Sequence, residues 1–260
     1  MTSSKILRSA VVVGSAALLL VGCAGGGSSG SAGSSAGSSK PTQSAAGVSS
    51  QPFNASKLLA GNASPAFPDG AKGTVVVVAE GTLVKPGLGA VLPIAYRNNT
   101  DKAIAHVDFT ATARLDGKLV ATGKSQGSTP AQVQAGEIGL AFIYFDDATA
   151  VPDTGTEYEY KADTLAADSS SYNTAPLVPS EVTNNGTSIV GTGTNNTGKA
   201  LTGPYSVDVY CFDGNTITNE IGDYADEDGD IAAKGQTTFT VDLADNSCAT
   251  FALGIGGYFK

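Results

Sequence analysis

An internal repeat constrains the fold of this chain more than any other feature of its sequence. Three landmarks recur with an offset of 97 residues: residues 98–103 (NNTDKA) return as residues 195–200 (NNTGKA), Asp116-Gly117 as Asp213-Gly214, and Phe142 as Phe239. A fixed offset shared by separate landmarks indicates two copies of one structural unit. We therefore expect two similar bodies in tandem.

Both copies carry the two-residue period of half-buried β-strands. Along residues 107–115, apolar side chains alternate with Asp108, Thr110, Thr112 and Arg114; the apolar set is Val107, Phe109, Ala111, Ala113 and Leu115. This alternation predicts a strand with one buried face. The Asp-Gly dipeptide that ends it is a hairpin signal. In the second copy, Val207, Val209 and Cys211 are expected to face inward.

The regular spacing of such segments predicts an all-β fold of two tandem immunoglobulin-like β-sandwich domains. The first is expected at residues 70–163 and the second at residues 178–260, with a polar linker at residues 164–177. No stretch of the sequence shows a convincing amphipathic helix.

The N-terminal residues have the order of a secretory signal. Lys5 and Arg8 precede an apolar run over residues 10–20, and the run ends at Leu20, Val21, Gly22 and Cys23. A charged start followed by a short apolar core marks a segment that is removed after export. The last four residues resemble the lipobox of bacterial lipoproteins. That resemblance implies a signal peptide at residues 1–22 and lipid on Cys23.

Residues 23–69 are expected to form a flexible tether disordered in solution, because residues 24–50 are almost entirely Gly, Ser and Ala. Two acyl chains hold a protein stably on a bilayer, whereas one holds it weakly. The diacylglyceryl cysteine that the lipobox resemblance implies supplies two. We therefore expect a lipid-anchored protein on the extracytoplasmic face of the cell membrane.

Composition narrows the classes of partner. The net charge is -9, and residues 178–260 hold eleven acidic side chains against three lysines. Nucleic acid and anionic lipid both require clustered basic side chains, so neither is an expected partner. With Cys23 lipidated, Cys211 and Cys248 remain, and outside the cytoplasm such a pair usually forms a disulfide. Two free buried thiols remain the alternative.

The second copy also resembles a known family. Residues 209–213 (VYCFD), followed by KGQTTFTV, resemble the FxLYD-type domains of bacterial surface lipoproteins. Asp213 matches the named motif literally, and the other core positions are hydrophobic apart from Cys211. The resemblance covers about 60 residues of each repeat. It implies an immunoglobulin-like sandwich at the cell surface and no catalytic residues.

Three motifs suggest catalysis or nucleotide binding but lack the context that each requires. Residues 26–30 (GGSSG) fit a nucleophile elbow, yet they lie in the predicted tether. Residues 193–200 approach a phosphate-binding loop, but Ala200 replaces the magnesium-binding hydroxyl. A turn between strands is the preferred interpretation. His106, the single histidine, is expected to be a solvent-facing strand residue beside Asp108. No catalytic residue and no cofactor are therefore predicted.

An acidic loop offers the only candidate for a metal. Asp223, Asp226, Asp228 and Asp230 crowd into eight residues, although they do not fit an EF-hand because its first and last ligands are missing. A calcium clip of another kind is the functional hypothesis, and a solvated acidic loop is the alternative.

These observations favour a non-catalytic binding or scaffolding role at the cell envelope. Its partner would be another envelope protein or a glycan, recognised by loops such as residues 98–103, 195–200 and 222–231. Two alternatives remain: an accessory subunit of an envelope transporter or enzyme, and a calcium-stabilised adhesion module.

Overall fold

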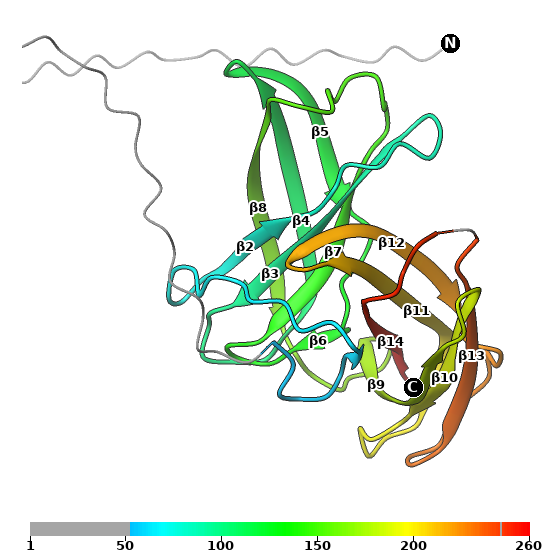
Figure 1. The fold of residues 1–260 in the computed structure, drawn as a ribbon. Helices are drawn as coiled ribbons and strands as arrows, with labels where there is room; N and C mark the ends of the chain where they lie inside the picture. The colour runs from blue at the N-terminus through cyan, green and yellow to red at the C-terminus, as the bar shows by residue number, and fades with distance from the viewer. Residues whose placement is uncertain (1–52, 245) are drawn as a thin grey trace, which may run out of the picture. The chain divides into compact units, whose positions relative to one another are not determined.

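The computed structural model describes residues 53–244 and 246–260, and every regular element in them is a β-strand. This confirms the predicted all-β class. The strands form two antiparallel seven-stranded sheets (Figure 1). The first sheet contains β2 (Val75–Glu80), β3 (Ala90–Asn98), β4 (Ile104–Leu115), β5 (Lys118–Ser125), β6 (Gln132–Val133), β7 (Ile138–Phe145) and β8 (Thr156–Ala166). The second contains β1 (Ala60–Gly61), β9 (Thr174–Asn184), β10 (Ser188–Thr194), β11 (Leu201–Asp213), β12 (Thr216–Tyr224), β13 (Gln236–Asp242) and β14 (Phe251–Phe259).

The first sheet, called the first half below, has the order β2-β3-β7-β5-β4-β6, and β8 also pairs with β4. The second sheet, called the second half, has the order β12-β11-β14-β9-β10-β13, and β1 pairs with β14. β9 begins at Thr174, so the C-terminal end of the predicted linker is part of a strand. β8 continues to Ala166, past the predicted end of the first domain.

Strand β4 shows the predicted alternation. Val107, Phe109, Ala111 and Ala113 are at most 2% exposed, whereas Asp108 between them is exposed. Together with side chains of β3 and β7 they form the core of the first half. Val207, Val209 and Cys211 face the core of the second half, as predicted.

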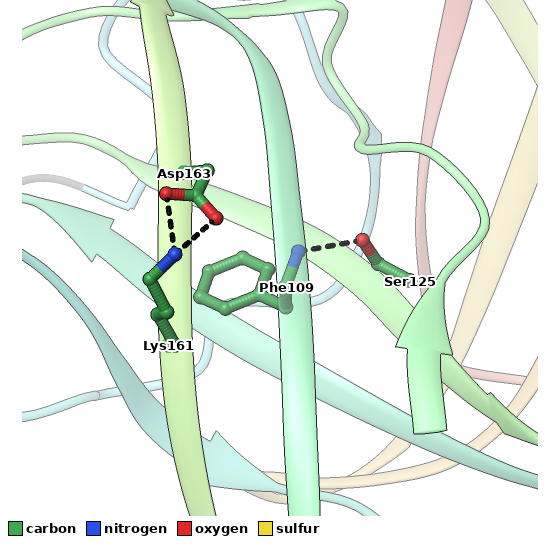
Figure 2. Close-up of polar contacts among 4 residues, drawn as sticks. All are labelled: Phe109, Ser125, Lys161 and Asp163. Carbon is green, nitrogen blue, oxygen red and sulfur yellow. Dashed lines mark hydrogen bonds and ion pairs between the residues drawn. The ribbon is translucent and has the colours of Figure 1, made fainter. Parts of the chain in front are cut away.

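Strand β5 connects two parts of the first sheet by changing its partner. It pairs with β4 as far as Lys124 and with β7 at Lys124 and Ser125, where Ser125 lies opposite Ile143. Where the pairing of β5 with β4 ends, the backbone N–H of Phe109 donates to Oγ of Ser125 at 2.8 Å (Figure 2). The Ser125 side chain thus replaces a backbone acceptor, which a buried N–H requires. Figure 2 also shows Lys161 paired with Asp163 on neighbouring β8, at the exposed surface.

The buried asparagine of each repeat builds the same turn in both halves. Nδ2 of Asn98 donates to Lys102 O (2.7 Å) and Val133 O (3.0 Å), and Oδ1 accepts from the Thr100 hydroxyl (2.6 Å). Nδ2 of Asn195 donates to Lys199 O (2.7 Å), and its Oδ1 accepts from the Thr197 hydroxyl (2.7 Å). Both asparagines are 0% exposed. The repeated NNT motif is therefore a structural element of the fold.

The third landmark of the repeat is displaced by one residue in the structure. Ile94 lies opposite Ala141, and Gly191, which is 97 residues after Ile94, lies opposite Phe239. Ala141 is therefore the structural equivalent of Phe239. Phe239 is 1% exposed, whereas Phe142 is only partly buried. A shift of one residue moves a strand side chain to the other face of its sheet.

Residues 53–69, assigned above to the flexible tether, are instead packed against both halves. Leu59 and Phe67 are buried in a third apolar cluster, which also contains Leu140 of the first half and Tyr210 of the second. Strand β1 pairs with β14. Apolar side chains in this stretch bury enough surface to offset the entropy of ordering it.

Arg97 fastens this N-terminal stretch to the first half. Arg97 is 1% exposed, and its guanidinium donates to Phe67 O at 3.3 Å, Pro68 O at 3.2 Å and Gly136 O at 2.7 Å. Glu137 adds a second link, because it accepts hydrogen bonds from the Ser56 hydroxyl and backbone. All described residues thus belong to one compact unit.

Candidate functional site

A cavity of about 500 Å³ lies where residues 126–131 of the first half approach β11, β12 and β14 of the second half. It is called the groove below. Phe142 of β7 also borders it. Small-molecule sites commonly have volumes of about 300–1,000 Å³ and occur where two structural parts meet. The groove is therefore the candidate site on grounds of size and position.

The loop of residues 126–131 is joined to the floor of the groove by one hydrogen bond. The Thr129 hydroxyl donates to Oδ2 of Asp208 at 2.6 Å. Backbone bonds between Thr129 and Leu140 of β7, at 2.8 and 2.7 Å, hold the loop in place from the other side. Asp208 is therefore held by an element that is itself well anchored.

Cross-strand pairing assembles the floor of the groove. Asp208 of β11 lies opposite Gly222 of β12 on one side and opposite Gly254 of β14 on the other. Tyr210, two residues further along β11, lies opposite Glu220. Side chains two apart share a face of the sheet, so Asp208, Tyr210 and Glu220 occupy one surface.

A β-bulge places Glu220 on this surface. Near the hairpin, Phe212 pairs with Ile217, but the next pair is Cys211 with Asn219. Thr218 is thus the extra residue, and its hydroxyl donates to Cys211 O at 3.2 Å. Without the bulge, Asn219 would lie opposite Tyr210 instead of Glu220. Bulges redirect side chains in this way next to functional sites.

Gly222 lies beside the two carboxylates and has no side chain to separate them. A Cβ atom on Gly222 would lie 3.3 Å from Oε1 of Glu220 and 3.6 Å from Oδ1 of Asp208. One oxygen of each carboxylate therefore borders the same small volume above Gly222. Gly254, on the other side of Asp208, faces Thr129, where a Cβ would be only 2.5 Å from the Thr129 methyl carbon.

Burial raises the pKa values of three side chains that line the groove. Loss of solvent raises the pKa of Glu220 to about 7, and the neighbouring charge of Asp208 adds to this increase. Burial also raises the pKa of Asp208, whereas the Thr129 hydrogen bond lowers it. The pKa of Tyr210 is raised by burial and by the same two carboxylates. Strong shifts of this kind concentrate at functional sites.

The outer part of the groove is lined by aromatic side chains. Tyr224 of β12 is 62% exposed, and Tyr258 of β14 is 39% exposed. No Lys, Arg or His is among the described residues that line the groove. The arrangement can therefore offer negative charge, aromatic faces and hydroxyl groups to a ligand.

Sequence reasoning did not identify Asp208, Glu220 or Thr129. The usable signal was the polar alternation of Ser206 and Asp208 on a strand whose other face is apolar. That signal indicates an exposed face, and it does not show that another part of the chain covers it.

Cys211 and Cys248 lie at disulfide distance, with their Cα atoms 5.0 Å apart, as predicted. Both are buried in the core of the second half. The pairing joins β11 to the segment between β13 and β14, on the face of β11 opposite the groove. The lipobox Leu20, Val21, Gly22 and Cys23 lies outside the described residues.

The structure does not bring the four candidate calcium ligands together. Asp226 accepts a hydrogen bond from Thr238, Asp230 pairs with Lys260, and Asp223 accepts from the backbone of Tyr224. No three His, Cys, Asp or Glu side chains are grouped for a metal within residues 53–244 and 246–260. The calcium hypothesis therefore has no geometric support in the described part of the chain.

The remaining candidates have structural partners. The Asn195 turn leads directly into β11, so the phosphate-loop pattern lacks its helix. Nε2 of His106 lies 3.0 Å from Oδ1 of Asn173, at a bulge of β4 where His106 has a φ of +47°. His106 thus contacts the segment before β9 instead of facing solvent freely.

Comparison of the sequence with protein-family models and with curated proteins finds no match. Across the described ranges, the chain has no helix of the length and apolar character needed to cross a membrane.

Proposed function

We propose that this chain is a lipid-anchored, extracytoplasmic binding protein with no catalytic role, and that its ligand occupies the groove. The observation that carries the proposal is the pair of half-buried carboxylates, Asp208 and Glu220, which line the groove beside Gly222. Polar groups that converge in a cavity at the junction of two parts are the usual mark of a binding site.

The anchor rests on the sequence. Lys5 and Arg8, the apolar run and Cys23 have the order of a lipoprotein signal. The paired Cys211 and Cys248 are consistent with an oxidising compartment outside the cytoplasm. We also propose that each half is an immunoglobulin-like domain of the FxLYD type, supported by the shared turn at Asn98 and Asn195.

The anchor is tested by the change Cys23→Ala, followed by fractionation of cells. We expect the variant to appear in the soluble fraction or as unprocessed precursor, because no acyl chain can be attached. Normal processing together with membrane retention equal to the unmodified protein would refute the anchor.

The groove is tested by photo-cross-linking in intact cells. A photoreactive p-benzoylphenylalanine in place of Tyr224 should give adducts, because Tyr224 borders the groove. The same group in place of Tyr172, which is 77% exposed and does not border the groove, serves as the control. Adducts of equal yield and mass at both positions, or none at position 224, would count against a ligand in the groove.

A further inference from the structure

The carboxylates of the groove lack a positively charged partner within the described chain. Its lining includes the carboxylates of Asp208 and Glu220 and no basic side chain. Glu220 is half-buried, and the described residues offer it neither a hydrogen bond nor an ion pair. Buried carboxylates are normally paired, so this arrangement indicates that a cation is supplied from outside.

Both carboxylates and Gly222 line the groove side by side, so a small cationic group in the groove can reach both carboxylates. Oε1 of Glu220 and Oδ1 of Asp208 border the same volume above Gly222, which has no side chain to fill it. An ammonium group at this place contacts both carboxylates. The rest of the cavity, about 500 Å³ in all, is large enough for an organic body attached to that group.

The aromatic side chains suit the same chemistry. Tyr224 and Tyr258 border the groove and keep part of their rings exposed. The face of a tyrosine ring attracts a nearby ammonium group through its quadrupole. Carboxylates and open tyrosine rings in one cavity are therefore complementary to an organic cation.

From this geometry we infer that the groove binds a small organic amine, with its ammonium group held between Asp208 and Glu220. The inference rests on the groove being the ligand site proposed above. A divalent metal is less well matched, because calcium takes six to eight oxygen ligands and the described residues provide no such group. A neutral sugar would leave both carboxylates without a counter-charge.

The test is calorimetric titration of the full chain in detergent micelles at pH 8, with 1,5-diaminopentane as the probe. The neutral 1,5-pentanediol has the same length, and calcium chloride tests for a metal. We expect the diamine to bind with a Kd below about 1 mM and the other two to give no saturable heat. Glu220→Gln and Asp208→Asn should each weaken diamine binding about tenfold or more, since each removes a contact of the ammonium group.

Two further variants separate this site from general electrostatics. Glu157→Gln makes the same charge change at an exposed position of β8, away from the groove, and should leave the affinity unchanged. Gly222→Ala places a methyl group in the space between the carboxylates. Its nearest obstacle is the end of the flexible Glu220 side chain, so the protein should fold normally and lose diamine binding.

The affinity should also fall about tenfold from pH 8 to pH 6. Glu220 becomes largely protonated over this range, because its pKa is about 7, whereas a diamine remains charged. Glu220→Gln should remove most of this pH dependence.

The inference would be overturned if the diol bound as tightly as the diamine, or if calcium bound saturably and the diamine did not. It would also be overturned if no diamine bound up to about 10 mM, or if Glu220→Gln left the affinity for the diamine unchanged. If position 224 still gives specific photo-adducts in cells, only the amine fails and the groove remains a ligand site. If those adducts are absent too, the proposed function fails with it.

Discussion

The Thr129 hydroxyl donates a 2.6 Å hydrogen bond to Oδ2 of Asp208, and this bond joins the two halves of the chain. Asp208 is half-buried, so its carboxylate has lost much of its hydration. The single neutral donor partly compensates for that loss. The same contact therefore contributes to the stability of the interface and fixes a carboxylate of the groove.

We predict that Thr129→Val lowers the free energy of unfolding by about 1–3 kcal/mol, because it leaves a half-buried carboxylate without its donor. Urea denaturation at pH 7 measures the change. A double-mutant cycle with Asp208→Ala, which removes the acceptor, isolates the contact and should give a coupling energy of at least about 0.5 kcal/mol. Strict additivity of the two changes would show that the hydrogen bond is energetically unimportant.

Glu220 should make the protein less stable as the pH rises. Its pKa is raised from 4.5 in the reference state to about 7 by burial and by Asp208. A carboxyl group with a raised folded-state pKa favours folding in its protonated form, and this advantage is lost as pH rises toward and through 7. Glu220→Gln should therefore be more stable than the unmodified protein at pH 8, with a difference about 2–3 kcal/mol larger than at pH 5.

Urea denaturation of both proteins at pH 5 and pH 8 measures this difference. Glu157→Gln, at an exposed position on β8, is the control and should show no such dependence on pH. A pH-independent difference between Glu220→Gln and the unmodified protein would place the Glu220 carboxyl in solvent.

The buried asparagines should be equally important in the two repeats. We predict that Asn98→Ala and Asn195→Ala each cost about 2–3 kcal/mol, since each removes several hydrogen bonds from a buried turn. Asn196→Ala is the control, because Asn196 is exposed, and it should change stability by less than about 0.5 kcal/mol. Thermal unfolding monitored by circular dichroism ranks the three variants. A loss confined to one repeat would contradict the structural equivalence.

Removal of the cysteine pair should destabilise the second half. Cys211→Ala with Cys248→Ala opens a loop with a sequence separation of 37 residues, and the chain-entropy model predicts a loss of about 3–4 kcal/mol. Chemical denaturation of the double variant measures the loss, and reduction of the unmodified protein should lower its stability by a similar amount. No effect of a reductant on the unmodified protein would indicate that the thiols are free.

The features that could be predicted from sequence are those encoded by neighbouring residues. The alternation from Val107 to Ala113 identifies a strand and its buried face, because the two-residue period depends only on the local backbone. The repeated Asn-Asn-Thr motif identifies equivalent turns. It does not reveal which of two adjacent asparagines is buried, since that depends on the acceptors that the distant Val133 and Ile231 provide.

The candidate site could not be predicted because it depends on register and on contacts between distant residues. Glu220 faces the groove only because Thr218 is an extra residue in β12. Asp208 is covered only because Thr129, 79 residues earlier in the chain, approaches it. The candidate calcium ligands Asp226 and Asp230 are close in the chain, but Asp226 accepts from Thr238 and Asp230 pairs with Lys260.

Phe142 and Phe239 are separated by the 97-residue offset of the repeat, but they do not occupy equivalent positions in the two sheets. Their substitution should therefore have different effects on stability. Phe239 lies opposite Gly191 with 1% of its surface exposed, so Phe239→Ala should cost about 3–5 kcal/mol. Phe142 is only partly buried at the border of the groove, and Phe142→Ala should cost clearly less. Urea denaturation compares the two variants directly. Equal losses would mean that the two strands share the 97-residue offset after all, and that Ala141 is not the equivalent of Phe239.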